Sequence, residues 1–137
     1  MDAEIITQAA RASLDGTLSF PEIVSRLLAA GVEYYHVDYV GRRTTFYSAT
    51  GTMVVTSLDF EGLPSVAADF DSVALQANIR DSQQQGQKFR GFTHRAMAAG
   101  TQGYFAFLRG KRVIYFGRQG DQHTEWFPGM NPASVTA

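Results

Sequence analysis

The fold is decided by a stretch of sequence that the chain contains twice. Residues 20–52 read FPEIVSRLLAAGVEYYHVDYVGRRTTFYSATGT, and residues 89–121 read FRGFTHRAMAAGTQGYFAFLRGKRVIYFGRQGD. Aligned without gaps, the stretches are 69 positions apart and share nine of 33 residues. Three of the shared residues are glycines at expected turns and helix ends: Gly31/Gly100, Gly41/Gly110 and Gly51/Gly120. Since glycine is selected where the backbone needs unusual conformations, the match predicts two copies of one structural unit.

Each copy predicts a helix followed by a β-hairpin. In the first copy, Ser19 and Glu22 have the spacing of a capping box, and Gly31 is placed to end the helix. The second helix, with Phe89, Phe92 and Ala96 as packing positions, is expected to end at Gly100. The predicted strands are residues 32–40, 43–49, 103–109 and 112–117, joined by two-residue turns at Gly41–Arg42 and Gly110–Lys111, with short strands near 52–56 and 122–127.

Two further helices are predicted outside the matched stretches. Residues 3–14 place Ile6, Ala9, Ala10 and Leu14 on one side, and residues 71–85 begin at an Asp71 N-cap and end at Gly86, with Val73, Ala77 and Ile79 as packing positions. We therefore predict an α+β fold with a mainly antiparallel sheet, in which residues 1–127 form a single compact domain. Residues 59–69 are expected to form a loop and residues 128–137 a loosely ordered tail.

Composition narrows the classes of function. The 137 residues are 45% hydrophobic, which supports a real core, and contain no cysteine, which excludes disulfides and thiolate sites. A net charge of −1 argues against a nucleic-acid partner, because phosphate binding needs clustered positive charge. No apolar run reaches the roughly 20 residues of a membrane helix, and the acidic N-terminus is unlike a signal peptide. A cytoplasmic location without a membrane partner is expected.

Strand alternation predicts different faces on the two hairpins. In the first, an apolar face of Tyr35, Val37, Tyr39 and Phe46 is expected to pack on the helices, and the opposite face is polar: His36, Asp38, Thr45 and Tyr47. In the second hairpin both faces are apolar. Its second face is a candidate interface, to be covered by the helix at 71–85 or by another subunit: Phe105, Phe107, Ile114 and Phe116.

Two polar clusters are candidates for function. His36 and Asp38, with Thr45 and Tyr47, could supply a general base or a hydrogen-bonding floor for a ligand, but ordinary solvated strands also carry such residues. Asp121, His123 and Glu125 alternate and are expected on one strand face. His123 and Glu125 are the candidate metal ligands, whereas the simpler interpretation is an edge strand whose charges block further pairing. No phosphate-binding or hydrolase motif is present, and no cofactor is expected.

Several runs resemble the YbcV/YdfO-like family of bacterial and prophage-encoded proteins, some labelled phage envelope protein. The runs are Ala98–Gly100, Gly103–Phe105, Gly110–Arg118 and His123–Pro128, with Phe20–Pro21, Ala30–Val32, Tyr35 and Val37–Asp38 in the first copy. The resemblance spans nearly the whole chain and implies a compact α+β fold. It implies no activity, cofactor or catalytic residue.

The sequence therefore predicts a non-catalytic binding module. A small polar molecule or a protein would bind in a cleft between the polar face of the first hairpin and the strand at 121–125. One alternative is a small hydrolase or metal-dependent enzyme using His36/Asp38 or His123/Glu125. A second alternative is an oligomeric interaction protein, such as a homodimer, which associates through the apolar face of the second hairpin.

Overall fold

A computed structural model describes residues 1–58 and 60–131. The chain forms a six-stranded antiparallel sheet and four helices, which confirms the α+β fold. In chain order the elements are α1 (Ala3–Asp15), α2 (Phe20–Ala29), β1 (Val32–Asp38), β2 (Arg43–Ser48), β3 (Met53–Ser57), α3 (Ser72–Gln85), α4 (Phe89–Ala98), β4 (Thr101–Phe107), β5 (Arg112–Gly117) and β6 (Gln122–Trp126). The strand order across the sheet is β3-β2-β1-β4-β5-β6. None of the described helices is long and apolar enough to cross a bilayer.

The two halves of the chain contain the same elements at the same spacing. Helices α2 and α4 begin at Phe20 and Phe89, which are 69 positions apart, and every strand of the first half has a counterpart at that distance. Helices α1 and α3 also begin 69 positions apart, although their sequences gave no match. The structural repeat is therefore a complete α-α-β-β-β unit, longer than the stretch that the sequence identities mark.

The halves join at the centre of the sheet, where β1 pairs with β4. His36 lies directly opposite Phe105, its own counterpart in the second half. The backbone hydrogen bonds around this pair are symmetric. The Leu108 amide donates to the Glu33 carbonyl, and the Tyr39 amide, its counterpart, donates to the Gln102 carbonyl. An approximate twofold axis thus passes through the sheet at His36 and Phe105.

Helix ends follow the sequence signals. Ser19 and Glu22 form the predicted capping box, and the Asp71 carboxylate accepts from the Ala74 amide at 2.9 Å. Gly31 ends the α2 turn with a φ of +91°, in the left-handed region that glycine adopts at little cost.

The hairpin turns differ from the prediction of two-residue type II′ turns. Asp38 pairs with Arg43, so residues 39–42 form a four-residue loop, and residues 108–111 do the same in the second half. The left-handed positions are Arg42 (φ +57°) and Lys111 (φ +60°) rather than the glycines. The first loop is favoured because the Asp38 carboxylate accepts from the amides of Val40 and Gly41. The register therefore moves by two residues, which leaves each side chain on its predicted face.

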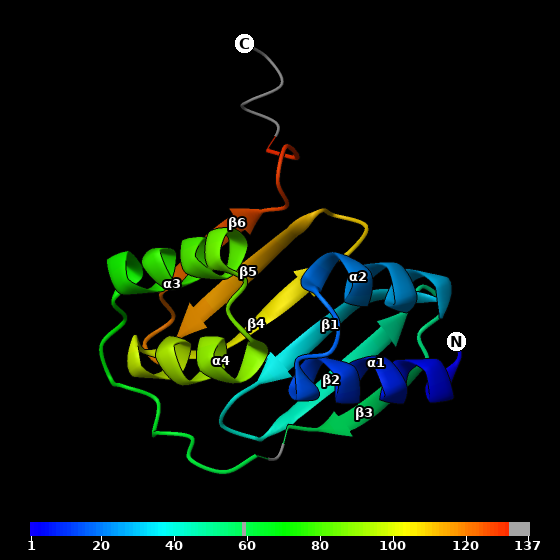
Figure 1. Cartoon of the computed structure of the whole chain (residues 1–137), viewed down its shortest axis with the longest axis horizontal. Helices are drawn as coiled ribbons and strands as arrows, with labels where there is room; N and C mark the ends of the chain where they lie inside the picture. The colour runs from blue at the N-terminus through cyan, green and yellow to red at the C-terminus, as the bar shows by residue number, and fades with distance from the viewer. Residues whose placement is uncertain (59, 132–137) are drawn as a thin grey trace.

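All four helices cover one face of the sheet (Figure 1). The core lies between these layers and includes Ile6, Leu27, Tyr35, Val37, Leu75 and Met97, each 7% exposed or less. Helix α3 lies in the same layer as the other helices, so it cannot cover Phe105 and Phe107 as one prediction proposed. Of its predicted packing positions, Ile79 is buried as expected, but Ala77 is exposed and Val73 is 74% exposed. Asn78 is buried and donates to the Phe92 carbonyl.

The helices form two pairs, α1 with α2 and α3 with α4. The pairs are joined at one end, where the start of α4 meets the end of α1. Lys88 Nζ donates to the Gly16 carbonyl and Arg90 Nε donates to the Leu14 carbonyl, both at 2.7 Å. These cations occupy the negative end of α1, where they stabilise its unpaired carbonyls. Away from this junction, α2 and α3 stand apart over the centre of the sheet (Figure 1).

Candidate functional site

The sheet face opposite the helices is open and largely apolar. None of the described helices covers it. We call this surface the open face. Strand pairing places these side chains on it: Met53, Val55 and Ser57 on β3, Arg43, Thr45 and Tyr47 on β2, Tyr34, His36 and Asp38 on β1, Phe105 and Phe107 on β4, Arg112, Ile114 and Phe116 on β5, and Gln122, Thr124 and Trp126 on β6. The predicted interface residues therefore share a surface with both polar candidates of the β2 strand. Met53 and Val55 are 63% and 52% exposed.

Aromatic rings on the open face stack sideways against one another. Tyr34 stacks on Tyr47 at a centroid distance of 4.6 Å, and His36 stacks on Phe105 at 4.3 Å. Phe105 and Phe107 are nearly parallel at 5.7 Å. Because these ring faces contact neighbouring rings, solvent meets mostly ring edges. Such a surface suits close packing against another apolar layer better than stacking of nucleic-acid bases.

The predicted His36–Asp38 pair does not form a catalytic dyad. Asp38 Oδ1 accepts the turn amides of Val40 and Gly41, and no hydrogen bond joins Asp38 to His36 within the described residues. Burial lowers the pKa of His36, while the charge of Asp38 opposes this shift and that of Arg43 adds to it. His36 is therefore a neutral ring at neutral pH within an aromatic surface.

The second polar cluster lies on the other side of the sheet. His123 pairs with Tyr115 and Glu125 with Val113, which places both side chains on the helix face at the edge strand β6. His123 Nε2 lies 3.0 Å from Glu125 Oε2. Asp121 precedes β6 and is exposed. Across residues 1–58 and 60–131, no three His, Asp or Glu side chains are grouped as metal ligands would be.

The cleft predicted between the two polar clusters is absent. His36 and its neighbours lie on the open face, whereas His123 and Glu125 lie on the helix face, and β4 and β5 separate them within the sheet. Alternation along one strand predicted each face correctly. Alternation does not predict how the two hairpins pair with each other, and this pairing is what separates the two clusters.

A row of tyrosines crosses the helix face. The sequence predicted these residues only as part of the core. Tyr35, Tyr104 and Tyr115 lie on β1, β4 and β5, with ring centroids 6.4 and 5.3 Å apart in turn, and the Tyr115 ring lies 6.3 Å from the His123 ring. Burial raises the pKa of all three tyrosines. The repeat carried a signal: Tyr35 and Tyr104 are the same residue at equivalent positions, while Tyr115 replaces Phe46.

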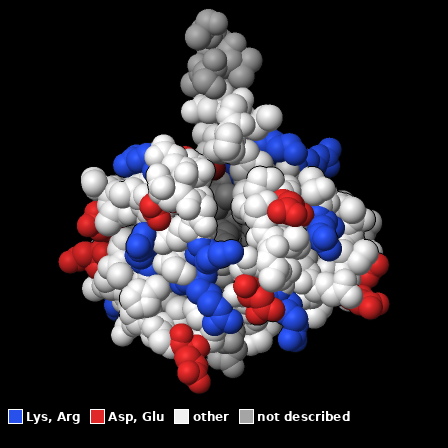
Figure 2. Space-filling view, viewed as in Figure 1, with Lys and Arg blue, Asp and Glu red and all other residues white. Residues whose placement is uncertain are grey.

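The hydroxyls of this row have no hydrogen-bond partner among the described residues. Each of the three side chains is more than nine-tenths buried, yet its hydroxyl is neither hydrogen-bonded within the described part of the chain nor completely enclosed. The hydroxyl of Tyr39, by contrast, is completely enclosed. In the space-filling view the helix face is hollowed between the two helix pairs (Figure 2).

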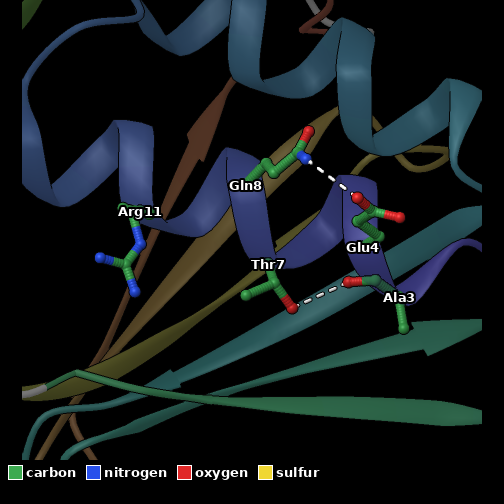
Figure 3. Close-up of a pocket in the computed structure, with 5 residues that line it drawn as sticks. All are labelled: Ala3, Glu4, Thr7, Gln8 and Arg11. Carbon is green, nitrogen blue, oxygen red and sulfur yellow. Dashed lines mark hydrogen bonds between the residues drawn. The ribbon is translucent and has the colours of Figure 1, made fainter.

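A separate shallow depression lies along α1 (Figure 3). Its polar groups bond within the helix: Thr7 donates to the Ala3 carbonyl at 2.8 Å, and Gln8 donates to Glu4 at 3.5 Å. Arg11 also lines this surface and has no hydrogen-bond partner among the described residues (Figure 3). Because the surface is one exposed helix face, it brings no groups from other elements together around a ligand.

Comparison with known proteins assigns no relative. No protein-family model matches the chain, and no curated protein matches it. The site residues must therefore be argued from the chain itself.

Proposed function

We propose that the protein is a non-catalytic binding module that works as a homodimer, with the open face as the interface between its two copies. The observation that carries this proposal is the band of aromatic and aliphatic side chains that crosses the open face from Met53 and Val55 on β3 to Trp126 on β6, with no described layer above it. Monomeric proteins rarely leave so large an apolar surface in water, because covering it releases the free energy of the hydrophobic effect.

The area suits a second copy of the chain. Strands lie about 4.8 Å apart and rise about 3.4 Å per residue, so a six-stranded face measures roughly 25 by 20 Å, on the order of 500 Å². Two such faces would bury on the order of 1,000 Å², with the sheets about 10 Å apart. That total is close to the lower limit of roughly 1,200 Å² for specific protein interfaces.

The symmetry of the face also favours a second copy. The twofold axis at His36 and Phe105 makes the two halves of the open face similar in outline, so the surface can oppose itself in a closed arrangement. Its arginines lie near the ends of the strands: Arg43 is opposite Asp38 in the strand register, and the Arg112 guanidinium lies 4.6 Å from the Trp126 ring. Apolar rings and a neutral His36 occupy the middle, so stacking two copies buries little unpaired charge.

Sedimentation equilibrium on the purified chain tests the proposal. We expect a dimer, and we expect Phe107→Asp and Val55→Lys to convert it to a monomer, because the first places a charge on a central strand of the interface and the second on its edge strand β3. Val73→Asp is the matched control: Val73 is equally apolar and 74% exposed, but lies on the helix face, so this variant should stay dimeric.

Val55 is half exposed, so Val55→Lys should fold even if Phe107→Asp does not. Circular dichroism would verify the fold of each variant. A wild-type chain that remains monomeric at 100-micromolar concentration would refute the homodimer, as would a dimer that folded Val55→Lys leaves intact.

A further inference from the structure

We propose that the homodimer is switched by pH, with the imidazole of His36 at the centre of the open face as the group that separates the two copies on acidification. This inference rests on the homodimer proposed above and adds its regulation. Three features of the structure support it: the position of His36, the groups around its ring, and the residue at the equivalent position of the other half.

His36 lies at the centre of the surface that two opposed copies share. The approximate twofold axis passes between His36 and Phe105, which are opposite each other on the central strands β1 and β4. A closed dimer that covers the whole of both faces brings centre onto centre, and packed sheets lie about 10 Å apart. The two His36 rings, one from each copy, then lie within about 10 Å of each other in a layer from which water is excluded.

Among the described residues, no carboxylate is hydrogen-bonded to the His36 ring. The ring stacks on Phe105 at a centroid distance of 4.3 Å, and Thr45 is opposite it on β2. Two charged side chains act on it: Asp38, two residues along β1, and Arg43, which is opposite Asp38 on β2. Their charges act in opposite directions, and Asp38 already accepts two turn amides. The remaining neighbours on this face of β1, β2 and β4 are uncharged: Tyr34, Tyr47 and Phe107.

The other half of the chain shows that packing does not require a histidine at this place. The position equivalent to His36 is Phe105, 69 residues later and on the same face. Phenylalanine therefore suits the scaffold here, and what the imidazole adds is the ability to take up a proton near neutral pH. Of the three histidines, His36 alone lies on the open face, since His94 is exposed on α4 and His123 lies on the helix face.

Protonation of His36 opposes association. Burial already lowers the pKa of His36 in the single copy, and closing the dimer removes more water from the ring and sets the two rings against each other. Protons therefore bind the separated copies more tightly than the dimer. As pH falls below about 6.5, the dimer loses affinity, at a limiting rate of about tenfold per pH unit for each of its two His36 rings. Neutral pH favours the dimer, and mildly acidic pH favours single copies.

Sedimentation equilibrium at about pH 7.5, 6.5 and 5, at constant ionic strength, tests the switch. For wild type we expect the dissociation constant of the dimer to rise by about tenfold or more across this range. His36→Phe, which introduces the residue of the other half, should stay dimeric with a constant dissociation constant. His94→Gln is the matched control, because it removes a histidine from α4 and should keep the wild-type response. Circular dichroism at each pH would verify that the chains are folded.

The outcomes separate the switch from the homodimer. A wild-type dimer with the same dissociation constant at neutral and acidic pH overturns the switch and leaves the homodimer in place. A pH response that His36→Phe retains does the same. A wild-type chain that is monomeric at neutral pH overturns the homodimer and the switch with it. His36→Leu, a second side chain that takes up no proton, replaces His36→Phe if that variant does not fold.

Discussion

Replacing Thr101 by valine should stabilise the fold. Thr101 is fully buried at the start of β4, and its hydroxyl has no partner among the described residues. Its counterpart in the first half is Val32, which is 3% exposed in the same core. Valine has nearly the same shape as threonine and the same preference for strands, so the change removes an unpaired polar group without leaving a cavity.

The expected gain follows from the cost of burying a hydroxyl. That cost is roughly 1–3 kcal/mol when no hydrogen bond compensates, and we expect Thr101→Val to raise the free energy of unfolding by about 1–2 kcal/mol. For a chain of this length, each kcal/mol corresponds to about 3–5 °C in melting temperature. Urea unfolding followed by circular dichroism measures the free energy of unfolding, and a thermal melt at the same protein concentration measures the melting temperature.

The reverse change supplies the matched control. Val32→Thr places a hydroxyl in the equivalent position of the other half and should destabilise the fold by a similar amount, roughly 1–2 kcal/mol. The double variant should then be close to wild type. If Thr101→Val proves neutral or destabilising while Val32→Thr is destabilising, the Thr101 hydroxyl has a partner and the argument from unpaired hydroxyls fails there.

Three further outcomes are expected. His36→Phe should reduce the loss of stability on acidification. The pKa of His36 is lowered in the fold, so the unfolded chain takes up the proton first as pH falls below about 6.5, and this uptake favours unfolding. Urea midpoints measured between pH 5 and 8 should show this loss only in wild type. Gly100→Ala should lower the free energy of unfolding by several kcal/mol, because φ is +89° and the new Cβ would overlap the Asp69 carbonyl. Gly120→Ala adds its Cβ in open space and should lower it by about 1–2 kcal/mol. Similar thermal shifts for the two variants would contradict this. Asp38→Ala should lose about 1 kcal/mol with its two turn hydrogen bonds, and an unchanged melting temperature would show that the loop does not depend on them.

Local patterns predicted most of the architecture. The repeat located the helices and hairpins, and alternation placed Tyr35 and Val37 on the helix face and Phe105 and Phe107 on the other. These features depend on neighbours within a few residues, where backbone periodicity decides which way a side chain points. The two-residue turns were wrong in both hairpins; in the first, the side chain of Asp38 accepts from two amides of the loop.

The arrangement of sites depended on long-range pairing that no local pattern contains. The pairing of β1 with β4 sets His36 beside Phe105 and far from His123, and it merges the faces of both hairpins into one surface. Helix α3 was assigned Val73 as a packing position from its hydrophobicity, but the helix is held instead through the buried amide of Asn78. The row of tyrosines was not distinguished from the core because a buried tyrosine and a core phenylalanine give the same apolar pattern.

The central pairing of β1 with β4 has a consequence for how the chain assembles. Among the described strands it is the one pairing in the sheet that joins the two halves; the others join strands adjacent in sequence. Two chains that open at this seam could therefore exchange halves, each β1 pairing with the β4 of the other chain, with every hydrogen bond of the sheet preserved. Refolding at high concentration would then yield an intertwined species that dissociates only on unfolding.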